Sequence, residues 1–370
     1  MRILHTEASL GWGGQEIRIL TEAAGMIARG HSVELVCAPD ARIFSEAGRY
    51  GVRANALPVA RKRPFGLLAL ARFLSKHPVD VIDSHSSTDS WLSALACGAM
   101  RIRRKRPPAL VRTRHISAAV PRDAMTRWLY GKATAEIVTT GEAIREHLVR
   151  DLGVAPERVT SIPTGIDTVR FAPGDKITAR RGLGLPADVP LVGIVATLRS
   201  WKGHRFLIDA VPLLAHRETQ VLIIGEGPQR EALLRQIGEL GVTGRVRLVG
   251  NQTDVVPWLT ALDVFALPSY ANEGVPQALL QAMLVGVPCV TTNVGAIGEA
   301  AIPDHTALVV AKQNAVALAA GIDRLLGDSA IVRRLTLAAR ERALAKFSLD
   351  AMLDRMEAVL VRAVHEQRRA

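Results

Sequence analysis

The stretch from residue 263 to residue 299 constrains the fold most, because it sets two kinds of regular structure beside each other. Residues 263–267 are mostly apolar and are stopped by Pro268, which predicts a short buried strand. Residues 277–285 have the apolar content of a helix packed on a sheet, and Gly286 is placed to end it. Residues 287–292 predict the next strand. The helix start, with its partial positive charge, is a site suited to a phosphate.

The loop before this helix carries the most specific motif in the chain, with Glu273 and Gly274 ahead of Pro276. It resembles the donor-binding signature of the family-four retaining glycosyltransferases: Pro-Ser, Glu-Gly, Pro, a second Glu, Ala-Met, Gly-x-Pro and Thr-x-x-Gly. The resemblance implies that Glu273 contacts the donor sugar and that residue 281 holds the ribose. The chain departs from the family there, since Gln281 keeps hydrogen-bonding capacity but lacks the charge. The donor-binding positions implied by the motif are Gly274, Val275, Pro276, Gln277 and Gln281.

A second basic and glycine-rich group is predicted at the ends of the strands that precede this stretch. Residues 190–197 form an apolar run typical of a strand buried on both faces, and Arg199 and Lys202 follow it. Two cations three residues apart suit a diphosphate, and the Arg-x-x-Lys-Gly order resembles the family's diphosphate clamp. The resemblance also implies donor contacts from three residues that follow the next two strands: Gly225, Gly227 and Asn251.

The N-terminal residues predict a β-α-β unit with a glycine turn at residues 11–14. A dinucleotide fingerprint requires a third glycine where the chain has Glu16, so that assignment fails. The turn at residues 225–228 lacks its third glycine as well, which argues against a dinucleotide-dependent oxidoreductase. The resemblance implies instead that Gly13 and Gly14 face the donor diphosphate and the acceptor.

Two histidines stand directly after predicted strands, His85 after residues 79–84 and His115 at the end of residues 110–115. Ligands bind at the carboxyl ends of strands in open parallel sheets, and histidine titrates near neutrality. These are the best acid–base candidates. For His115 the resemblance, through a Val-x-Thr-x-His context, implies a place beside the transferred sugar. For His85 a structural and a functional reading are nearly balanced.

The chain has 370 residues, enough for two domains. We expect a Rossmann-like, acceptor-binding domain at residues 1–170 and a Rossmann-like donor domain at 171–346, with residues 171–174 and the polar stretch after them as the linker. Residues 347–370 are expected to form a helix that crosses back to the first domain. The fold class is therefore α/β, and the resemblance implies the GT-B fold, with two parallel sheets facing across a cleft.

The net charge of +12 is uneven. Residues 1–170 hold 25 Lys and Arg against 16 Asp and Glu (+9), and residues 171–370 hold 22 against 19 (+3). Basic clusters at 61–63 and 101–106 favour a peripheral contact with an anionic membrane. The three cysteines have no metal-like spacing, and neither a signal peptide nor a membrane span is predicted, which favours a cytoplasmic protein with reduced thiols.

The resemblance implies a metal-independent glycosyltransferase that moves a sugar from a nucleotide-diphosphate sugar to a glycan or lipid-linked acceptor. Cell-surface polysaccharide or lipopolysaccharide synthesis is the expected setting, and no cofactor is expected. The catalytic group would be His115, Glu273, Arg199 and Lys202. A sugar-nucleotide epimerase or phosphorylase of the same architecture remains the nearest alternative. A nucleic-acid-binding protein, prompted by the basic charge, is disfavoured by an aromatic content of only 4%.

Overall fold

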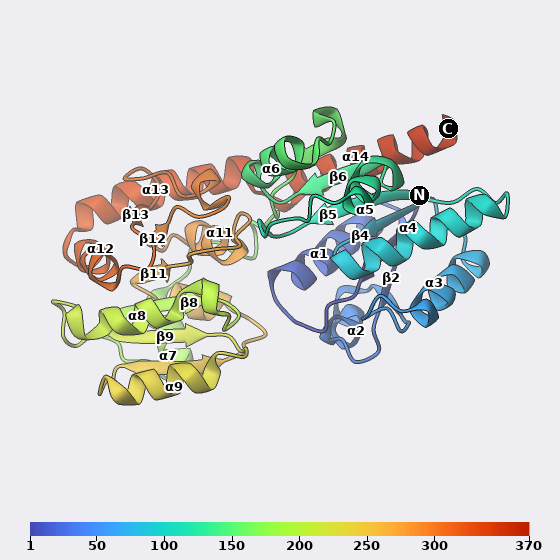
Figure 1. Cartoon of the computed structure of the whole chain (residues 1–370). Coiled ribbons are helices and arrows are strands. Elements are labelled where there is room, and N and C mark those ends of the chain that lie inside the picture. Colours follow the sequence, from blue (N-terminus) through green and yellow to red (C-terminus); the bar gives the residue numbers. More distant parts are fainter. Residues whose placement is uncertain (370) are drawn as a thin grey trace. The chain divides into compact units, whose positions relative to one another are not determined.

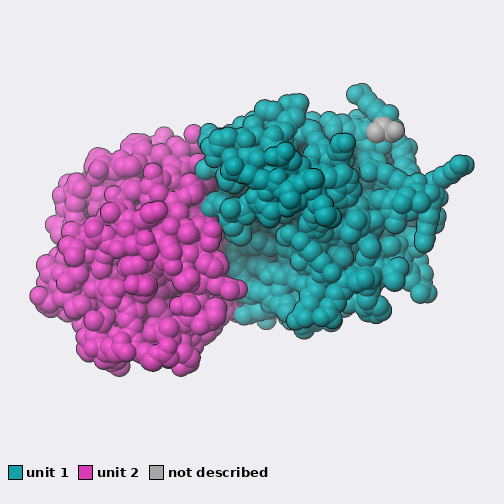
Figure 2. Space-filling model, viewed as in Figure 1, with its two compact units in different colours: residues 1–163, 350–370 teal, residues 164–349 magenta. Residues whose placement is uncertain are grey.

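The computed structural model describes residues 1–369 and divides them into two compact units (Figure 2). Unit 1 contains Met1–Pro163 and the C-terminal residues from Asp350 onward, and unit 2 contains Thr164–Leu349. Each unit has its own sheet of parallel strands, as the alternation of strands and helices predicts.

Unit 1 is built on a seven-stranded sheet with the order β3-β2-β1-β4-β5-β6-β7 (Figure 1). Its strands are β1 (Arg2–Glu7), β2 (Ser32–Cys37), β3 (Arg53–Ala56), β4 (Val81–Ser84), β5 (Ala109–Arg114), β6 (Glu136–Thr139) and β7 (Val159–Ser161). Its α-helices are α1 (Gly14–Ala28), α2 (Arg42–Glu46), α3 (Pro64–Lys76), α4 (Ser87–Ile102), α5 (Ala124–Trp128), α6 (Glu142–Leu152) and α14 (Leu349–Arg369). Short helical turns complete it: η1 (Ala47–Tyr50), η2 (Leu129–Ala133) and η3 (Pro156–Arg158).

Unit 2 is built on a six-stranded sheet with the order β10-β9-β8-β11-β12-β13. Its strands are β8 (Leu191–Val195), β9 (Gln220–Ile224), β10 (Val246–Gly250), β11 (Val264–Leu267), β12 (Cys289–Thr292) and β13 (Leu308–Val310). Its α-helices are α7 (Lys176–Gly182), α8 (His204–Ala210), α9 (Arg230–Glu239), α10 (Val256–Thr260), α11 (Gln277–Val285), α12 (Ala315–Gly327) and α13 (Ser329–Lys346). The turns are η4 (Ser200–Lys202), η5 (Val211–Leu213) and η6 (Ile297–Glu299).

Local sequence accounts for where the helices beside the predicted sites begin and end. In α4 the Ser86 side chain and the Asp89 carboxylate form a reciprocal capping box. Helix α11 ends at Gly286, which is left-handed with φ 87°, as expected. Its bounds, Gln277–Val285, are the expected ones, and Pro276 is extended (ψ 122°) as the N-cap.

The linker prediction at 171–174 is wrong. Phe171 is buried in the core of unit 2, and residues 176–182 form helix α7. The Arg180 side chain of α7 reaches Asp263 (2.6 Å) and the carbonyl of Ala261 (3.0 Å). The units divide at 163/164 and 349/350, against the expected 170/171 and 346/347. The polar residues of α7 are typical of a linker in the sequence. In the structure the buried Arg180 bonds the helix to the rest of unit 2.

The C-terminal helix α14 belongs to unit 1, where Figure 1 shows it in red beside β6. Arg362 on α14 binds the buried Glu136 of β6 (3.1 Å), and Glu357 binds both Arg29 and His31. The contacts of α14 therefore run along unit 1, although the helix before it, α13, is part of unit 2.

The contacts of two polar side chains on β1 show which helix covers each face of the unit 1 sheet. Thr6 donates a hydrogen bond to Asp89 of α4, while the neighbouring His5 feels the charge of Arg18 on α1. Successive residues of a strand point to opposite faces, so α4 covers one face and α1 covers the other. No helix among residues 1–369 is long and apolar enough to cross a membrane. The three cysteines are free and buried, as expected.

Candidate functional site

In unit 2 the residues expected to bind the donor meet at the carboxyl ends of β8 and β11, which pair directly. Lys202 ends the η4 turn after β8, and Glu273 lies in the loop between β11 and α11. The Lys202 Nζ lies 2.7 Å from Glu273 Oε1 and 2.9 Å from Oε2. Ser269 donates a third hydrogen bond to Oε1 (2.6 Å). The sequence motifs thus come together as one partly buried ion pair, with Glu273 in the loop that leads into α11.

Two left-handed glycines allow the backbone to close around this ion pair. Gly203 has φ +77°, and a Cβ there would lie 2.0 Å from the carbonyl of Pro268. Gly295 has φ +57°, and a Cβ there would lie 2.0 Å from the carbonyl of Glu273 itself. Any larger residue at either position would push the loop that carries Glu273 out of place.

The other expected donor residues of unit 2 surround the same strand ends. Gly225 and Gly227 form a turn after β9 that packs on residues 196–198, with Leu198 N–H bonded to the carbonyl of Glu226 (3.0 Å). Around the start of α11, Gly274, Val275 and Pro276 are buried, Gln277 is half-buried, and Gln281 is 9% exposed. Asn251 is exposed after β10.

Arg199 occupies a different position from its expected partner Lys202. Its side chain is exposed, and its guanidinium lies 5.8 Å from the centre of the Trp201 ring. Lys202 is held by Glu273, so the two cations are not equivalent.

In unit 1 the expected histidines are neighbours on paired strands, and a third histidine extends them. His85 Nδ1 lies 3.0 Å from His115 Nε2, and His85 Nε2 lies 2.9 Å from His5 Nδ1. His5 and His85 are fully buried, and His115 is half-buried. Since a neutral imidazole has one donor and one acceptor, a chain of three such rings fixes the orientation of the last one.

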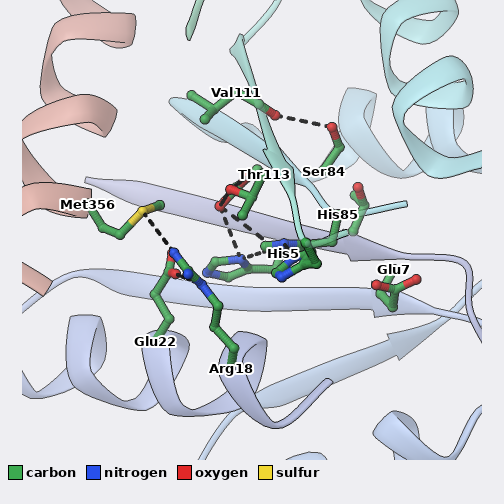
Figure 3. Close-up of polar contacts among 12 residues, drawn as sticks. His5, Glu7, Arg18, Glu22, Ser84, His85, Val111, Thr113 and Met356 are labelled. Carbon is green, nitrogen blue, oxygen red and sulfur yellow. Dashed lines mark hydrogen bonds and ion pairs between the residues drawn. The ribbon is translucent and has the colours of Figure 1, made fainter. Parts of the chain in front are cut away.

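Buried charged side chains lie on either side of the histidine chain (Figure 3). Asp83 Oδ2 lies 3.9 Å from His5 and 3.7 Å from His85, and its carboxylate also accepts from Thr113 (2.8 Å). Arg18 pairs with Glu22 (3.6 Å) on α1.

Burial controls the protonation of this group. It lowers the pKa of His5 to about 4, with the charge of Arg18 adding to the effect. Burial likewise holds the pKa values of His85 and His115 well below their usual range, with neighbouring positive charges adding to it. The pKa of Asp83 is raised, again mainly by burial. The three rings are therefore neutral near pH 7.

Sequence reasoning missed His5, Asp83 and Arg18. A signal was present, because His5 and Asp83 interrupt central strands of a parallel sheet that normally read as continuous apolar runs. His5, Asp83 and His85 are also the one trio among residues 1–369 with the proximity of metal ligands. The charge of Arg18 beside them opposes a second cation, and we propose no metal there.

The glycine turn of unit 1 precedes helix α1. Gly13 is its extended N-cap, and Gly14 begins the helix. The buried Glu7 at the end of β1 accepts from the Ser9 N–H (2.6 Å) and from Gln15. The pKa of Glu7 is raised, first by burial and then by the charges of Asp89 and Glu16. Nothing in the sequence motifs pointed to Glu7.

The fold as a whole matches solved structures, among them a glycosyltransferase from Rickettsia africae ESF-5 with a TM-score of 0.84 at 21% identity, covering 98% of each chain. Anabaena Alr3699/HepE in complex with UDP-glucose superposes with a TM-score of 0.86 at 21% identity, covering 98% of this chain and 99% of that chain. The two Rossmann-like units are those of the GT-B fold.

Sequence comparison then defines the family. Residues 12–170 match the model of Glycosyltransferase Family 4, and residues 189–328 match that of Glycosyl transferases group 1. The 2-deoxystreptamine glucosyltransferase of Streptomyces kanamyceticus is 30% identical over 77% of this chain and 81% of its own length. The chain belongs to the family 4, group 1 glycosyltransferases and is a glycosyltransferase.

Two further relatives act in different settings. The D-inositol 3-phosphate glycosyltransferase of Stackebrandtia nassauensis is 29% identical over 78% of this chain and 70% of its own length. The lipopolysaccharide core biosynthesis glycosyltransferase LpsE of Rhizobium meliloti is 33% identical over 63% of this chain and 66% of its own length.

Proposed function

We propose that this glycosyltransferase moves a sugar from a nucleotide-diphosphate sugar, held on unit 2, to a glycan or lipid-linked acceptor. The observation that carries the proposal is the partly buried Lys202–Glu273 ion pair in the loops that follow β8 and β11. A lysine that is already held at these strand ends can turn to the diphosphate when the donor enters. Glu273 is then free to accept hydrogen bonds from the sugar hydroxyls.

The chemistry requires that the diphosphate leave with its negative charge offset. In this proposal Lys202, Arg199 and the N–H groups at the start of α11 supply the positive potential, without a metal or other cofactor. The neutral His115, oriented through His85, would hydrogen-bond the sugar or the acceptor near the reacting carbon. Retention of the anomeric configuration is proposed from the family resemblance.

Cell-surface polysaccharide or lipopolysaccharide synthesis is the setting we propose. The likeness to LpsE supports it, as does the basic excess of the first half of the chain. The exposed clusters at 61–63 and 101–106 would hold the enzyme against the inner face of an anionic membrane. If vesicles rich in anionic lipid fail to sediment the protein at low salt, the membrane part of the proposal is wrong.

The donor site is tested by a thermal-shift panel of UDP, GDP, ADP, CMP and NAD, on the wild type and on Lys202→Ala. A ligand that binds only the folded state raises the melting temperature. We expect one nucleoside diphosphate to stabilise the wild type and not the variant. A shift by NAD alone, or equal shifts in both proteins, would contradict the proposed donor site. Product analysis with donor alone separates transfer from epimerisation, because an epimerase needs no acceptor.

A further inference from the structure

Unit 1 contains a cavity of about 760 Å³ on the face of its sheet that α4 covers. Its walls come from the start of α3, from α4, from the end of β5 and from the segment that leads through α5 into η2. Much of the wall is apolar, including Trp91, Leu92, Leu95 and Leu129. This volume is in the range of pockets that hold small organic ligands. None of the residues assigned to sugar transfer lines it.

The same cavity is lined by four cations and by one carboxylate within the described residues. That carboxylate, Asp123, is occupied as the cap of α5, where it accepts from the Thr126 N–H (2.8 Å). The cations are Lys62, Arg63, Arg112 and Arg114. An apolar cavity with an uncompensated positive charge is suited to a ligand that combines an apolar body with an anionic group.

Arg112 is the most informative of these cations. Its side chain extends from β5 over the ring of Tyr130 (4.4 Å), and the residue is only 5% exposed. Its Nη1 is buried and has no hydrogen-bond partner among residues 1–369. Asp89, the carboxylate whose charge it feels, is already bound by Thr6, by Ser86 and by the His85 N–H.

A second arginine of the cavity is also incompletely paired. Arg114 donates to Tyr130 Oη (3.4 Å) and to the carbonyl of Ala118, but its buried Nε has no partner in the described chain. Lys62 stands over the Trp91 ring (5.5 Å), and burial together with the charge of Arg112 lowers its pKa. A buried guanidinium without an anion is costly, so an apolar residue would serve packing better. The cost is recovered when an anion binds.

We propose that this cavity binds a lipid phosphate, with the phosphate on Arg112, Arg114 and Lys62 and the apolar chain against Trp91, Leu95 and Leu129. Exposed apolar side chains at its edge, Leu95 (44%), Ile116 (44%) and Met125 (66%), give the chain a route of entry. The further statement that this lipid is the acceptor, or its carrier, rests on the proposed function. The proposal that a lipid phosphate binds in this cavity does not rest on the proposed function.

The test is a titration with dodecyl phosphate, kept below its micelle-forming concentration, with dodecanol and inorganic phosphate as separate arms. Binding is followed through Trp91 fluorescence, which Trp91→Phe identifies. We expect saturable binding of dodecyl phosphate, at least tenfold tighter than either of the other two. Equal binding of dodecanol, or equal binding of inorganic phosphate, would overturn the proposal of a combined site.

The variants separate the cavity from the surface charge. Arg112→Met should weaken dodecyl phosphate at least tenfold while its melting temperature stays at or above that of the wild type. Leu95→Asp, at an exposed position of the wall, should weaken it similarly by placing a charged group against the apolar chain. The matched control is Arg72→Met, an exposed arginine of α3 outside the cavity, which should bind as the wild type does. If Arg112→Met binds as tightly as the wild type, the proposal fails.

The two proposals fail separately. If a nucleoside diphosphate protects the protein but dodecyl phosphate does not bind, the lipid site is wrong and the donor site stands. If dodecyl phosphate binds and no nucleotide does, the lipid site stands and the donor site is wrong. If anionic vesicles hold the wild type and Arg112→Met equally and no single lipid is bound, the basic surface alone contacts membranes, and the cavity is not the site.

Discussion

Lys202 and Glu273 are 71 positions apart in the sequence and share two contacts of 2.7 and 2.9 Å in the fold. Lys202 is 20% exposed and Glu273 is 5% exposed in their side chains. The ion pair therefore positions the Lys202 ammonium and the Glu273 carboxylate beside each other. Each partner is expected to serve a different part of the donor, which makes their roles separable.

Changing the two partners one at a time should divide diphosphate binding from sugar binding. Lys202→Ala should abolish protection by the nucleoside diphosphate that stabilises the wild type and cost about 1–3 kcal/mol of unfolding free energy, because it leaves a buried carboxylate with fewer partners. Glu273→Gln should retain binding of that nucleotide but lose activity about a hundredfold, because Glu273 is expected to contact the donor sugar, which the nucleotide lacks. Calorimetry with the nucleotide and a product assay measure the two effects. Equal loss of nucleotide binding in both variants would contradict this division.

Gly295 should tolerate no side chain, because a Cβ would lie 2.0 Å from the Glu273 carbonyl. We expect Gly295→Ala to lose activity at least tenfold and to lower the melting temperature. The control is Gly238→Ala in helix α9, where nothing lies within 4 Å of the added atom. That change should be neutral or stabilise by up to about 1 kcal/mol. Full activity in Gly295→Ala would show that the Glu273 loop is adaptable.

Gln281→Glu should strengthen nucleotide binding if this position holds the ribose. A charge-assisted hydrogen bond is about twice as strong as a neutral one, so we expect roughly tenfold tighter binding. The gain should vanish with a 2′,3′-dideoxy analogue of the same nucleotide, which lacks the hydroxyls. Calorimetric titration of both ligands is the measurement. An equal gain for both would mean that the carboxylate acts elsewhere.

Replacement of His115 should impair transfer without affecting nucleotide binding, since it belongs to unit 1. We expect His115→Phe to lower kcat about a hundredfold, in the range typical for the loss of a hydrogen-bonding or acid–base group. Protection by the nucleoside diphosphate should be unchanged. His77→Gln, which alters a histidine at the end of α3, serves as the control and should remain active. A normal kcat in His115→Phe would remove the histidine chain from the mechanism.

Acid sensitivity of unit 2 should depend on His204. Burial, with the charge of Lys202, lowers the pKa of this ring to about 3. The unfolded chain takes up a proton near pH 6.5, whereas the folded one does so only near pH 3. Stability is therefore lost as the pH falls through this window, by up to about 1.4 kcal/mol per pH unit.

Urea unfolding at pH 7 and pH 5 measures this effect. His204→Phe should lose about 2 kcal/mol less than the wild type over that interval, because it has no proton to take up. His305→Phe should follow the wild type, since an exposed ring meets solvent in both states. If the wild type and His204→Phe lose the same stability, His204 is not responsible.

The fold class was predictable from the sequence alone, because the alternation of strand and helix periods leaves few ways to bury both. The order of residues around Glu273 and Lys202 singled out both members of the ion pair through the family resemblance, and each of them follows a strand of one parallel sheet. The 3.0 Å approach of His85 and His115 is consistent with the same rule. Short motifs and strand ends of this kind involve few neighbouring residues, so they can be recognised without knowledge of the tertiary structure.

Features that depend on contacts between distant segments became visible only in the folded protein. Helix α7 resembles a linker until Arg180 meets Asp263, 83 positions later. His5 and Arg112 resemble ordinary strand residues until the sheet and its helices bury them, one in a histidine chain and the other beside an apolar cavity. The charge and hydrogen-bonding of such residues depend on what surrounds them, and the surroundings come from parts of the chain that no local pattern connects.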